Sequence, residues 1–382
     1  MPLSASPQSP GRLPALDGLR GIAALVVLLY HLSLIARPFL DSATPADAWW
    51  WLTRTPLKLA TAGTEAVLVF FVLSGLVVAL PALRAGVSWP SYYVGRMLRL
   101  YIPVWAALLL SSALIILIPR DPAAVTPASW ISDTNAASVP VQQLLQEASL
   151  WQISYSINNV LWSLRWEVAF SLALPLFVAA AVVLRRFALV AAIIALAASA
   201  AGRLVNIDAL VYLPGFFVGT VLATHLPQLG EWCSYRSSGF WRAATATSLL
   251  TLIATFLTRS IVPAGTSLSG AIWGLSAAGA AGLVVCCVGS PWMIRMLSLR
   301  FPQFLGRISF SLYLVHVPLI ATLAFVMGDD RWWLVSLVGV PASLLVGWLF
   351  YRAIERPSHA LARTAGRFFA ARPRPVPVPT NQ

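Results

Sequence analysis

The chain has 382 residues, of which 59% are hydrophobic and only 10% are charged, whereas soluble domains carry roughly 25% charged residues. A mean hydropathy of +0.79 and long apolar runs along almost the whole length exclude an ordinary soluble protein. The formal net charge of +13 does not indicate a nucleic-acid partner, because the basic residues are scattered in loops between apolar runs and form no basic domain.

Ten apolar runs follow a short N-terminal segment, residues 1–15, that is rich in Pro and Ser. The first run is too long for the core of a signal peptide and lacks a clear small-residue cleavage site, so we interpret it as a retained helix. The sequence predicts an all-α, polytopic membrane protein with about ten transmembrane helices. We place them at 16–36, 59–80, 93–118, 159–183, 187–203, 206–224, 241–258, 268–289, 304–326 and 332–354.

The 26 basic residues are divided unequally between the two sides that ten spans define. If the N-terminus is cytoplasmic, 18 lie on the inner side and eight on the outer side, which agrees with the positive-inside rule. We therefore expect both termini in the cytoplasm. The eight outer residues are Arg37, Arg54, Lys58, Arg120, Arg165, Arg203, Arg259 and Arg331.

The longest connection, residues 119–158, is predicted to lie outside, and its length favours a functional role. The transmembrane domain is expected to cover residues 16–357. Residues 358–382 are expected to form a basic, Pro-rich cytoplasmic tail, with disorder from Ala371 to Gln382.

Ionisable side chains inside apolar runs are costly and are therefore functional candidates. His31 lies in the first run, Glu65 near the outer end of the second, Glu167 in the fourth and His316 in the ninth. Helical rise places His31, Glu167 and His316 at similar depth, near or just above the midplane. We expect His31 to act as a general base and Glu167 to orient it. Arg20 shares the face of His31, about 16 Å along the same helix.

Hydroxyl side chains extend this polar region. Ser163 lies one turn before the acidic residue of the fourth run, and Ser309 and Tyr313 precede His316 on the ninth. This spacing predicts a lined substrate cavity. A structural network is the favoured interpretation of His316, however, and His31 considered alone could equally serve helix packing.

Arg96 and Arg99 lie three residues apart at the start of the third run. Two arginines on one face of a helix suit phosphate groups, although ordinary positive-inside anchoring explains them as well. No metal site is expected, because Cys233, Cys286 and Cys287 form no Cys-x-x-Cys pair.

Six motifs in this order make the chain resemble the acyltransferase 3 family of integral membrane O-acyltransferases. Together they span residues 16 to 357 and are highly specific. In one departure, Ala66-Val67-Leu68 stands where the family often shows Gly-Val-Asp, so no function is carried onto Leu68. The motifs are Leu16-Asp17-Gly18-Leu19-Arg20-Gly21 with Tyr30-His31, Phe70-Phe71-Val72-Leu73-Ser74-Gly75, Arg96-x-x-Arg99-Leu100-Tyr101-x-Pro103, Trp162-Ser163-Leu164-Arg165-Trp166-Glu167, Gly306-Arg307-Ile308-Ser309-Phe310-Ser311-Leu312-Tyr313-Leu314-Val315-His316, and Glu355-Arg356-Pro357.

The resemblance implies O-acylation of a sugar hydroxyl or similar acceptor, with acyl-CoA, most simply acetyl-CoA, as co-substrate and no permanently bound cofactor. Family acceptors include envelope polysaccharides, lipopolysaccharide, peptidoglycan and macrolide antibiotics. His31 would be the catalytic residue. Arg20, Arg96 and Arg99 would bind the donor, and we assign Ser74 of the second motif to the same donor site. The chain has no room for the C-terminal hydrolase-like domain of some members.

A second hypothesis is a transporter or flippase of glycans or lipid-linked substrates, in which intramembrane His, Glu and Arg residues form a proton or substrate path. The sequence argues mildly against it, because no inverted repeat and no matched pair of broken helices is apparent. Consumption of acyl-CoA by the purified protein separates the two hypotheses.

Overall fold

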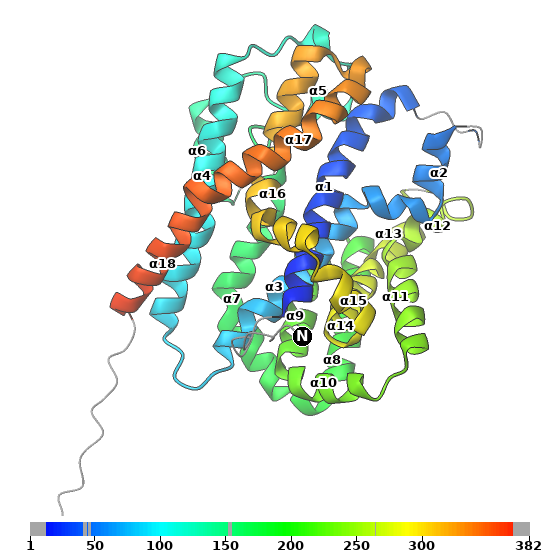
Figure 1. The fold of residues 1–382 in the computed structure, drawn as a ribbon, viewed down its shortest axis with the longest axis vertical. Coiled ribbons are helices and arrows are strands. Elements are labelled where there is room, and N and C mark those ends of the chain that lie inside the picture. Colours follow the sequence, from blue (N-terminus) through cyan, green and yellow to red (C-terminus); the bar gives the residue numbers. More distant parts are fainter. Residues whose placement is uncertain (1–12, 41–43, 45–46, 152–154, 264, 370–382) are drawn as a thin grey trace, which may run out of the picture.

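The computed structural model describes residues 13–40, 44, 47–151, 155–263 and 265–369. Every regular element among them is a helix, which confirms the predicted all-α class (Figure 1). The α-helices are α1 (Pro14–Leu40), α2 (Ala48–Arg54), α3 (Gly63–Ala82), α4 (Trp89–Leu117), α5 (Trp130–Thr134), α6 (Val141–Ser149), α7 (Leu164–Val183), α8 (Ala188–Leu204), α9 (Asp208–Thr224), α10 (Leu226–Ser234), α11 (Ser238–Leu252), α12 (Ala254–Leu257), α13 (Ser267–Gly274), α14 (Ser276–Gly289), α15 (Pro291–Leu297), α16 (Arg300–Met327), α17 (Trp332–Phe350) and α18 (Arg356–Phe369). Short 3₁₀ turns η1 to η5 are Pro56–Thr61, Pro122–Ala124, Asn159–Ser163, Arg185–Phe187 and Asp329–Arg331, and η6 (Tyr351–Glu355) is a π-helix.

Eight helical stretches of the described chain are long and apolar enough to cross a membrane, and nine are if α9 and α10 form one span. These two helices meet at 73° just before Pro227, whose ring cannot continue the hydrogen-bond ladder. The predicted span 241–258 is interrupted, because α11 ends at Leu252 and α12 adds only four residues. The multi-pass architecture is thus confirmed, while the cytoplasmic placement of both termini stays a prediction.

Helices α1 and α16 form the centre of the bundle and touch along their backbones. A Cβ atom on Gly21 would overlap the backbone nitrogen of Gly306, and one on Gly306 would overlap the carbonyl oxygen of Asp17. Small residues allow such close approach between helices in lipid, where van der Waals packing drives association. This contact places the polar faces of the two helices against each other.

The long loop between α4 and α7 is folded against α16 and does not hang free. The buried carboxylate of Glu147 accepts hydrogen bonds from the backbone N–H groups of Ser156, Ile157 and Asn158, at 2.7, 2.9 and 3.0 Å. The Asn158 amide then donates to the carbonyl oxygen of Leu314 on α16, at 2.9 Å. Buried backbone groups at this end of the bundle therefore have partners.

The loop has a second anchor at its beginning. The Arg120 guanidinium donates to the carbonyl oxygen of Ala136 at 2.7 Å and lies over the Phe325 ring of α16. Burial lowers the pKa of Arg120 to about 10, so the side chain is still charged at neutral pH.

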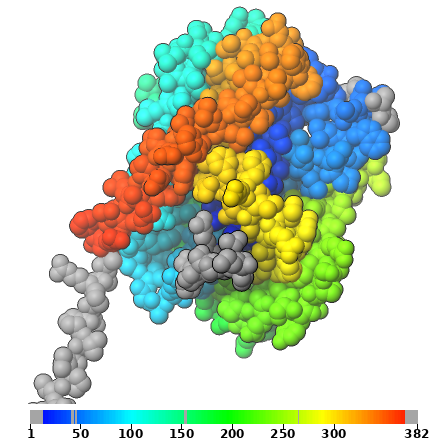
Figure 2. Space-filling model, in the orientation of Figure 1, coloured from blue at the N-terminus to red at the C-terminus, as the bar shows by residue number. Residues whose placement is uncertain are grey.

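The C-terminal part of the chain differs from the prediction. The last span, expected to end at 354, continues through η6 into α18, which packs along α4 as far as Phe369 (Figure 1). Figure 2 shows α17 and α18 as one continuous oblique ridge. Small or hydroxyl-bearing residues at Ser358, Ala362 and Gly366 form the buried face of α18, and this stripe explains why residues 358–369 are a packed helix and not a tail. The predicted disorder from Ala371 to Gln382, and most of segment 1–15, lie outside the described residues.

Glu147 is predicted to be the main support of the outer loop. Replacing it with Ala removes the carboxylate that accepts from three backbone N–H groups and leaves these buried groups without that acceptor. Glu147→Ala is therefore expected to lower the free energy of unfolding by about 3 kcal/mol. Thermal unfolding of the purified protein in detergent measures this. Glu231→Ala, which alters an exposed carboxylate, is the control, and equal midpoints for the two variants would contradict the prediction.

Candidate functional site

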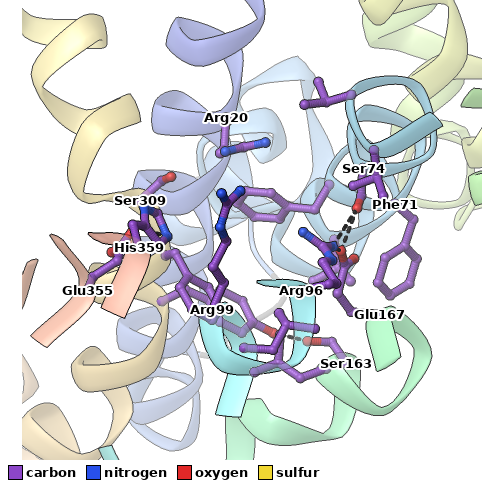
Figure 3. Close-up of a pocket in the computed structure, with 18 residues that line it drawn as sticks. Arg20, Phe71, Ser74, Arg96, Arg99, Ser163, Glu167, Ser309, Glu355 and His359 are labelled. Carbon is purple, nitrogen blue, oxygen red and sulfur yellow. Dashed lines mark hydrogen bonds and ion pairs between the residues drawn. The ribbon is translucent and has the colours of Figure 1, made fainter. Parts of the chain in front are cut away.

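A cavity of about 280 Å³ lies among α1, α3, α4, α7 and α16, with the start of α18 at its edge (Figure 3). Eight of the ten site residues predicted from the sequence line it, and only His31 and His316 do not. The eight are Arg20, Ser74, Arg96, Arg99, Ser163, Glu167, Ser309 and Tyr313.

One wall of the cavity is an ion pair between Arg96 of α4 and Glu167 of α7. Ser74 donates to the same carboxylate at 2.5 Å (Figure 3). The Arg96 Nε donates to Ser171 at 3.1 Å. Arg96 therefore serves mainly to hold α3, α4 and α7 together. Both Arg96 and Ser74 line the cavity and contact Glu167, and the expectation that they bind the donor stays a prediction.

The far end of the cavity is closed by Tyr313 and Phe70, whose rings meet edge to face at 5.9 Å. The Tyr313 hydroxyl lies 2.6 Å from Ser163 Oγ and donates to the carbonyl oxygen of Val160 at 3.1 Å. The predicted contribution of Ser163 and Tyr313 to one polar lining is therefore seen, and they form its ceiling.

His31 and His316 lie on the other side of this ceiling, with the His316 ring 6.0 Å from the Tyr313 ring. His316 Nε2 is 3.0 Å from His31 Nδ1, so the two buried imidazoles form a pair. The Trp130 ring of α5 covers His31 at 5.1 Å. The pair thus sits between the cavity and the outer loop.

The backbone fixes which nitrogens of this pair carry protons. His316 Nδ1 faces the carbonyl oxygen of Leu312 at 3.0 Å, and His31 Nδ1 faces that of Val27 at 2.9 Å. A carbonyl oxygen only accepts, so both Nδ1 atoms carry hydrogen. In neutral rings, the single Nδ1 hydrogen of His31 is then shared between the Val27 carbonyl oxygen and His316 Nε2, and the lone pair of His31 is on its Nε2. No described residue donates to that nitrogen.

The predicted contact between His31 and Glu167 is therefore wrong in this structure. Among the described residues His316 is the hydrogen-bonding side chain beside His31, and Glu167 is bound to Arg96 and Ser74. Similar depth along the membrane normal does not decide which way a side chain points around its helix. His316 is the direct partner of His31, and its interpretation as a structural residue stays untested.

The mouth of the cavity carries basic side chains from three helices. Arg20 of α1 and Arg99 of α4 point into it, and His359 of α18 joins them (Figure 3). Glu355 lies beside them and accepts from the backbone N–H and hydroxyl of Ser311, at 3.2 and 2.5 Å. No role was predicted for Glu355 or His359 from the sequence. The Glu-Arg-Pro motif was a signal for Glu355, but the π-helix that turns it inward has no sequence pattern.

A second polar cluster lies at the start of α3. Glu65 is 1% exposed, and its Oε1 accepts from Trp273 Nε1 at 2.9 Å. Nearby Lys58 is also buried, donates to the carbonyl oxygen of Thr61 at 3.1 Å and lies over the Phe256 ring. Glu65, noted in the sequence as an ionisable residue near the end of its span, thus belongs to an interhelical contact.

The buried amine of Lys58 is expected to make the free energy of unfolding of the protein depend on pH. Burial lowers the pKa of its amine to about 8, and the Glu65 carboxylate opposes only part of this shift. Between about pH 8 and pH 10.5 the unfolded chain therefore binds more protons at this residue, and stability rises with pH. From pH 7.5 to 9.5 the wild type is expected to gain about 1–2 kcal/mol relative to Lys58→Met. Chemical unfolding in detergent across this range tests it, and parallel curves would contradict it.

The Arg96–Glu167 pair is predicted to be strongly coupled. Arg96→Gln or Glu167→Gln leaves the remaining charge in a largely buried wall, so each is expected to lower the free energy of unfolding by about 2–3 kcal/mol. The double variant is expected to cost less than the sum of the two by about 1–2 kcal/mol. Thermal unfolding of all four proteins completes the cycle. Additive costs would show that the two side chains do not depend on each other.

Comparison with known proteins shows the family of the chain. A family model described as acyltransferase domain matches residues 13–352, and the chain therefore belongs to the acyltransferase 3 family of membrane proteins. It is similar to "Acyltransferase MdmB" of Streptomyces mycarofaciens, with 32% identity over 166 residues. That alignment covers 44% of this chain, and the chain spans about two fifths of the length of the relative, 39%. No solved structure matches the chain.

Proposed function

We propose that this protein is a multi-pass enzyme of the inner (plasma) membrane that transfers an acyl group, most simply acetyl, from acyl-CoA to a hydroxyl group of a sugar, glycan or macrolide-like acceptor. The observation that carries the proposal is the His31–His316 pair next to a cavity with a basic mouth, in a chain of the acyltransferase 3 family. The excess of basic residues on one side favours a cytoplasmic position for that mouth.

The donor is proposed to enter at the basic mouth. Its phosphate groups would stay beside Arg20 and Arg99, and its thioester arm would extend between Phe71, Leu100 and Phe310 toward the ceiling. Movement of the Tyr313 and Phe70 side chains would then open the short remaining path to His31.

The chemical step is proposed to use His31 as general base. Its Nε2 takes the proton of the acceptor hydroxyl as the oxygen attacks the thioester carbonyl carbon. When the C–S bond breaks, the same nitrogen returns that proton to the departing thiolate, so the products are an O-acyl ester and free CoA. His316 holds the N–H of His31 throughout and keeps the reacting nitrogen in the correct tautomer.

The acceptor is proposed to approach from the outer loop, because the indole of Trp130 lies directly over His31. Donor and acceptor would then meet at His31 from opposite sides of the bundle. Glu167, which was expected to orient His31, would instead act by keeping Arg96 and the cavity wall in place.

The two histidines are predicted to differ in a defined way. His31→Gln removes the base and is expected to lower acyl transfer by about 10²–10⁴-fold. His316→Gln keeps an acceptor oxygen near the position of Nε2, whereas His316→Phe removes the acceptor, so the Phe variant is expected to lose about tenfold more activity than the Gln variant.

Cells that express each variant, supplied with radiolabelled acetate to label their acetyl-CoA, provide the measurement, with mass spectrometry of envelope glycans and small metabolites to locate the label. Arg54→Gln, in α2 and away from the cavity lining, is the control. Wild-type labelling in His31→Gln would overturn the mechanism. Failure of the purified wild type to consume acetyl-CoA in the presence of acceptor extracts would favour the transporter hypothesis.

A further inference from the structure

Five basic side chains gather where α18 crosses α4. Arg99 of α4 and His359 of α18 line the cavity, and His359 lies in the electrostatic field of Arg99, Arg363, Arg96 and Arg20. Arg363 follows His359 by one helical turn, so the two share a face of α18. The cluster therefore has two walls, one from the α1 and α4 arginines and one from α18.

The packing of α18 holds this second wall in position. A Cβ atom on Gly366 would lie 3.1 Å from the hydroxyl of Ser91, and one on Gly95 would lie 3.6 Å from the carbonyl oxygen of Ala362. The Ser88 hydroxyl also donates to the carbonyl oxygen of Phe369 at 3.0 Å. Close approach of the two helices brings the His359–Arg363 face beside Arg99.

Among the residues that the structure describes, the charges of the cluster are not balanced. Arg96 is neutralised by Glu167. The other carboxylate that lines the cavity, Glu355, is occupied by Ser311 and lies 4.0 Å from His359. Arg20, Arg99 and Arg363 therefore face a single remaining carboxylate, and like charges this close repel. A bound anion with more than one negative charge relieves that repulsion.

The shape of the cavity indicates what such an anion is attached to. Besides these basic groups and the Arg96–Glu167 pair, the lining holds apolar and aromatic side chains, among them Phe71 and Phe310. A ligand with phosphoester groups at one end and a long uncharged arm at the other matches both parts. Inorganic phosphate fills only the mouth.

We propose that His359 and Arg363 of α18, together with Arg20 and Arg99, form the subsite for the phosphoester groups of the acyl donor, and that Arg96 is not part of it. The inference rests on the proposed function and deepens it. The proposed donor site extends beyond residues 13–352, the segment that the family model matches. It includes α18, which was predicted from the sequence to be a tail.

Binding measurements separate the phosphoester end from the arm. Protein purified in neutral detergent without anionic lipid is titrated calorimetrically with CoA, with pantetheine, which lacks the nucleotide, and with adenosine 3′,5′-bisphosphate, which lacks the arm. The double variant His359→Gln/Arg363→Gln is expected to raise the Kd for CoA and for the bisphosphate at least about tenfold and to leave that for pantetheine unchanged. Arg352→Gln is the charge-matched control, because the Arg352 guanidinium lies over Trp348 and outside the cavity lining.

Each outcome supports or overturns the proposed α18 subsite. An unchanged Kd for CoA in the double variant, or an equal loss of affinity for CoA and pantetheine, overturns the α18 subsite. In that case acetyl transfer by the wild type still supports the proposed function. If the double variant loses bisphosphate binding and the wild type does not consume acetyl-CoA, the subsite is supported and the proposed function is rejected. If the wild type binds none of the three ligands but retains phosphatidylglycerol from vesicles through α18, the site belongs to a lipid headgroup and the donor subsite is rejected.

Discussion

The backbone contact between α1 and α16 is the constraint on which the rest of the site depends. Gly21 and Gly306 meet where the two helices are closest. His31 lies ten residues after Gly21, and His316 lies ten residues after Gly306. In two helices that run in the same direction, equal offsets bring residues to the same height, here about 15 Å from the glycine contact. The imidazoles meet because the glycines set the register.

The same register also separates two electrostatic environments. On the side of the glycine contact the cavity holds Arg20, Arg99 and the Arg96–Glu167 pair. Above the Tyr313 ceiling the two histidines have only each other, backbone carbonyl groups and aromatic rings as near neighbours. An imidazole must be unprotonated, and therefore uncharged, before it can act as a general base, and a donor with several phosphates needs cations. The two requirements conflict within one small pocket, and a layer of side chains keeps them apart.

The sequence was sufficient for the class of fold and for most of the polar side chains that line the cavity. Apolar length located the helices, and intramembrane polar residues at helical spacing found Ser163, Glu167, Ser309 and Tyr313. The sequence was not sufficient to predict which of these side chains contact each other. Glu167 and His316 have similar calculated depths, and only the rotation of α7 about its axis sends Glu167 to Arg96 and away from His31. That rotation is set by interhelical packing, which no single segment encodes.

The C-terminal helix shows a second limit of the same kind. A Pro at 357 and a rising density of Arg residues are typical of a helix end followed by a tail. The chain continues as a helix through a π-turn just before Pro357, and the Pro ring lies in the first turn of α18. The turn also directs Glu355 inward to Ser311, and the buried stripe of small residues fits α18 against α4.

The basic mouth of the cavity gives the leaving group of the proposed reaction a consistent direction. In the proposed reaction negative charge develops on the thiolate sulfur while the phosphates of the same molecule remain at the mouth. Cations at Arg20 and Arg99 attract both along one axis, away from His31 and the new ester. An acceptor that enters under Trp130 leaves by the opposite path. In the proposed reaction, the separation of the basic mouth from the two histidines would thus serve binding of the donor, the unprotonated state of His31 and release of the two products to different ends of the bundle.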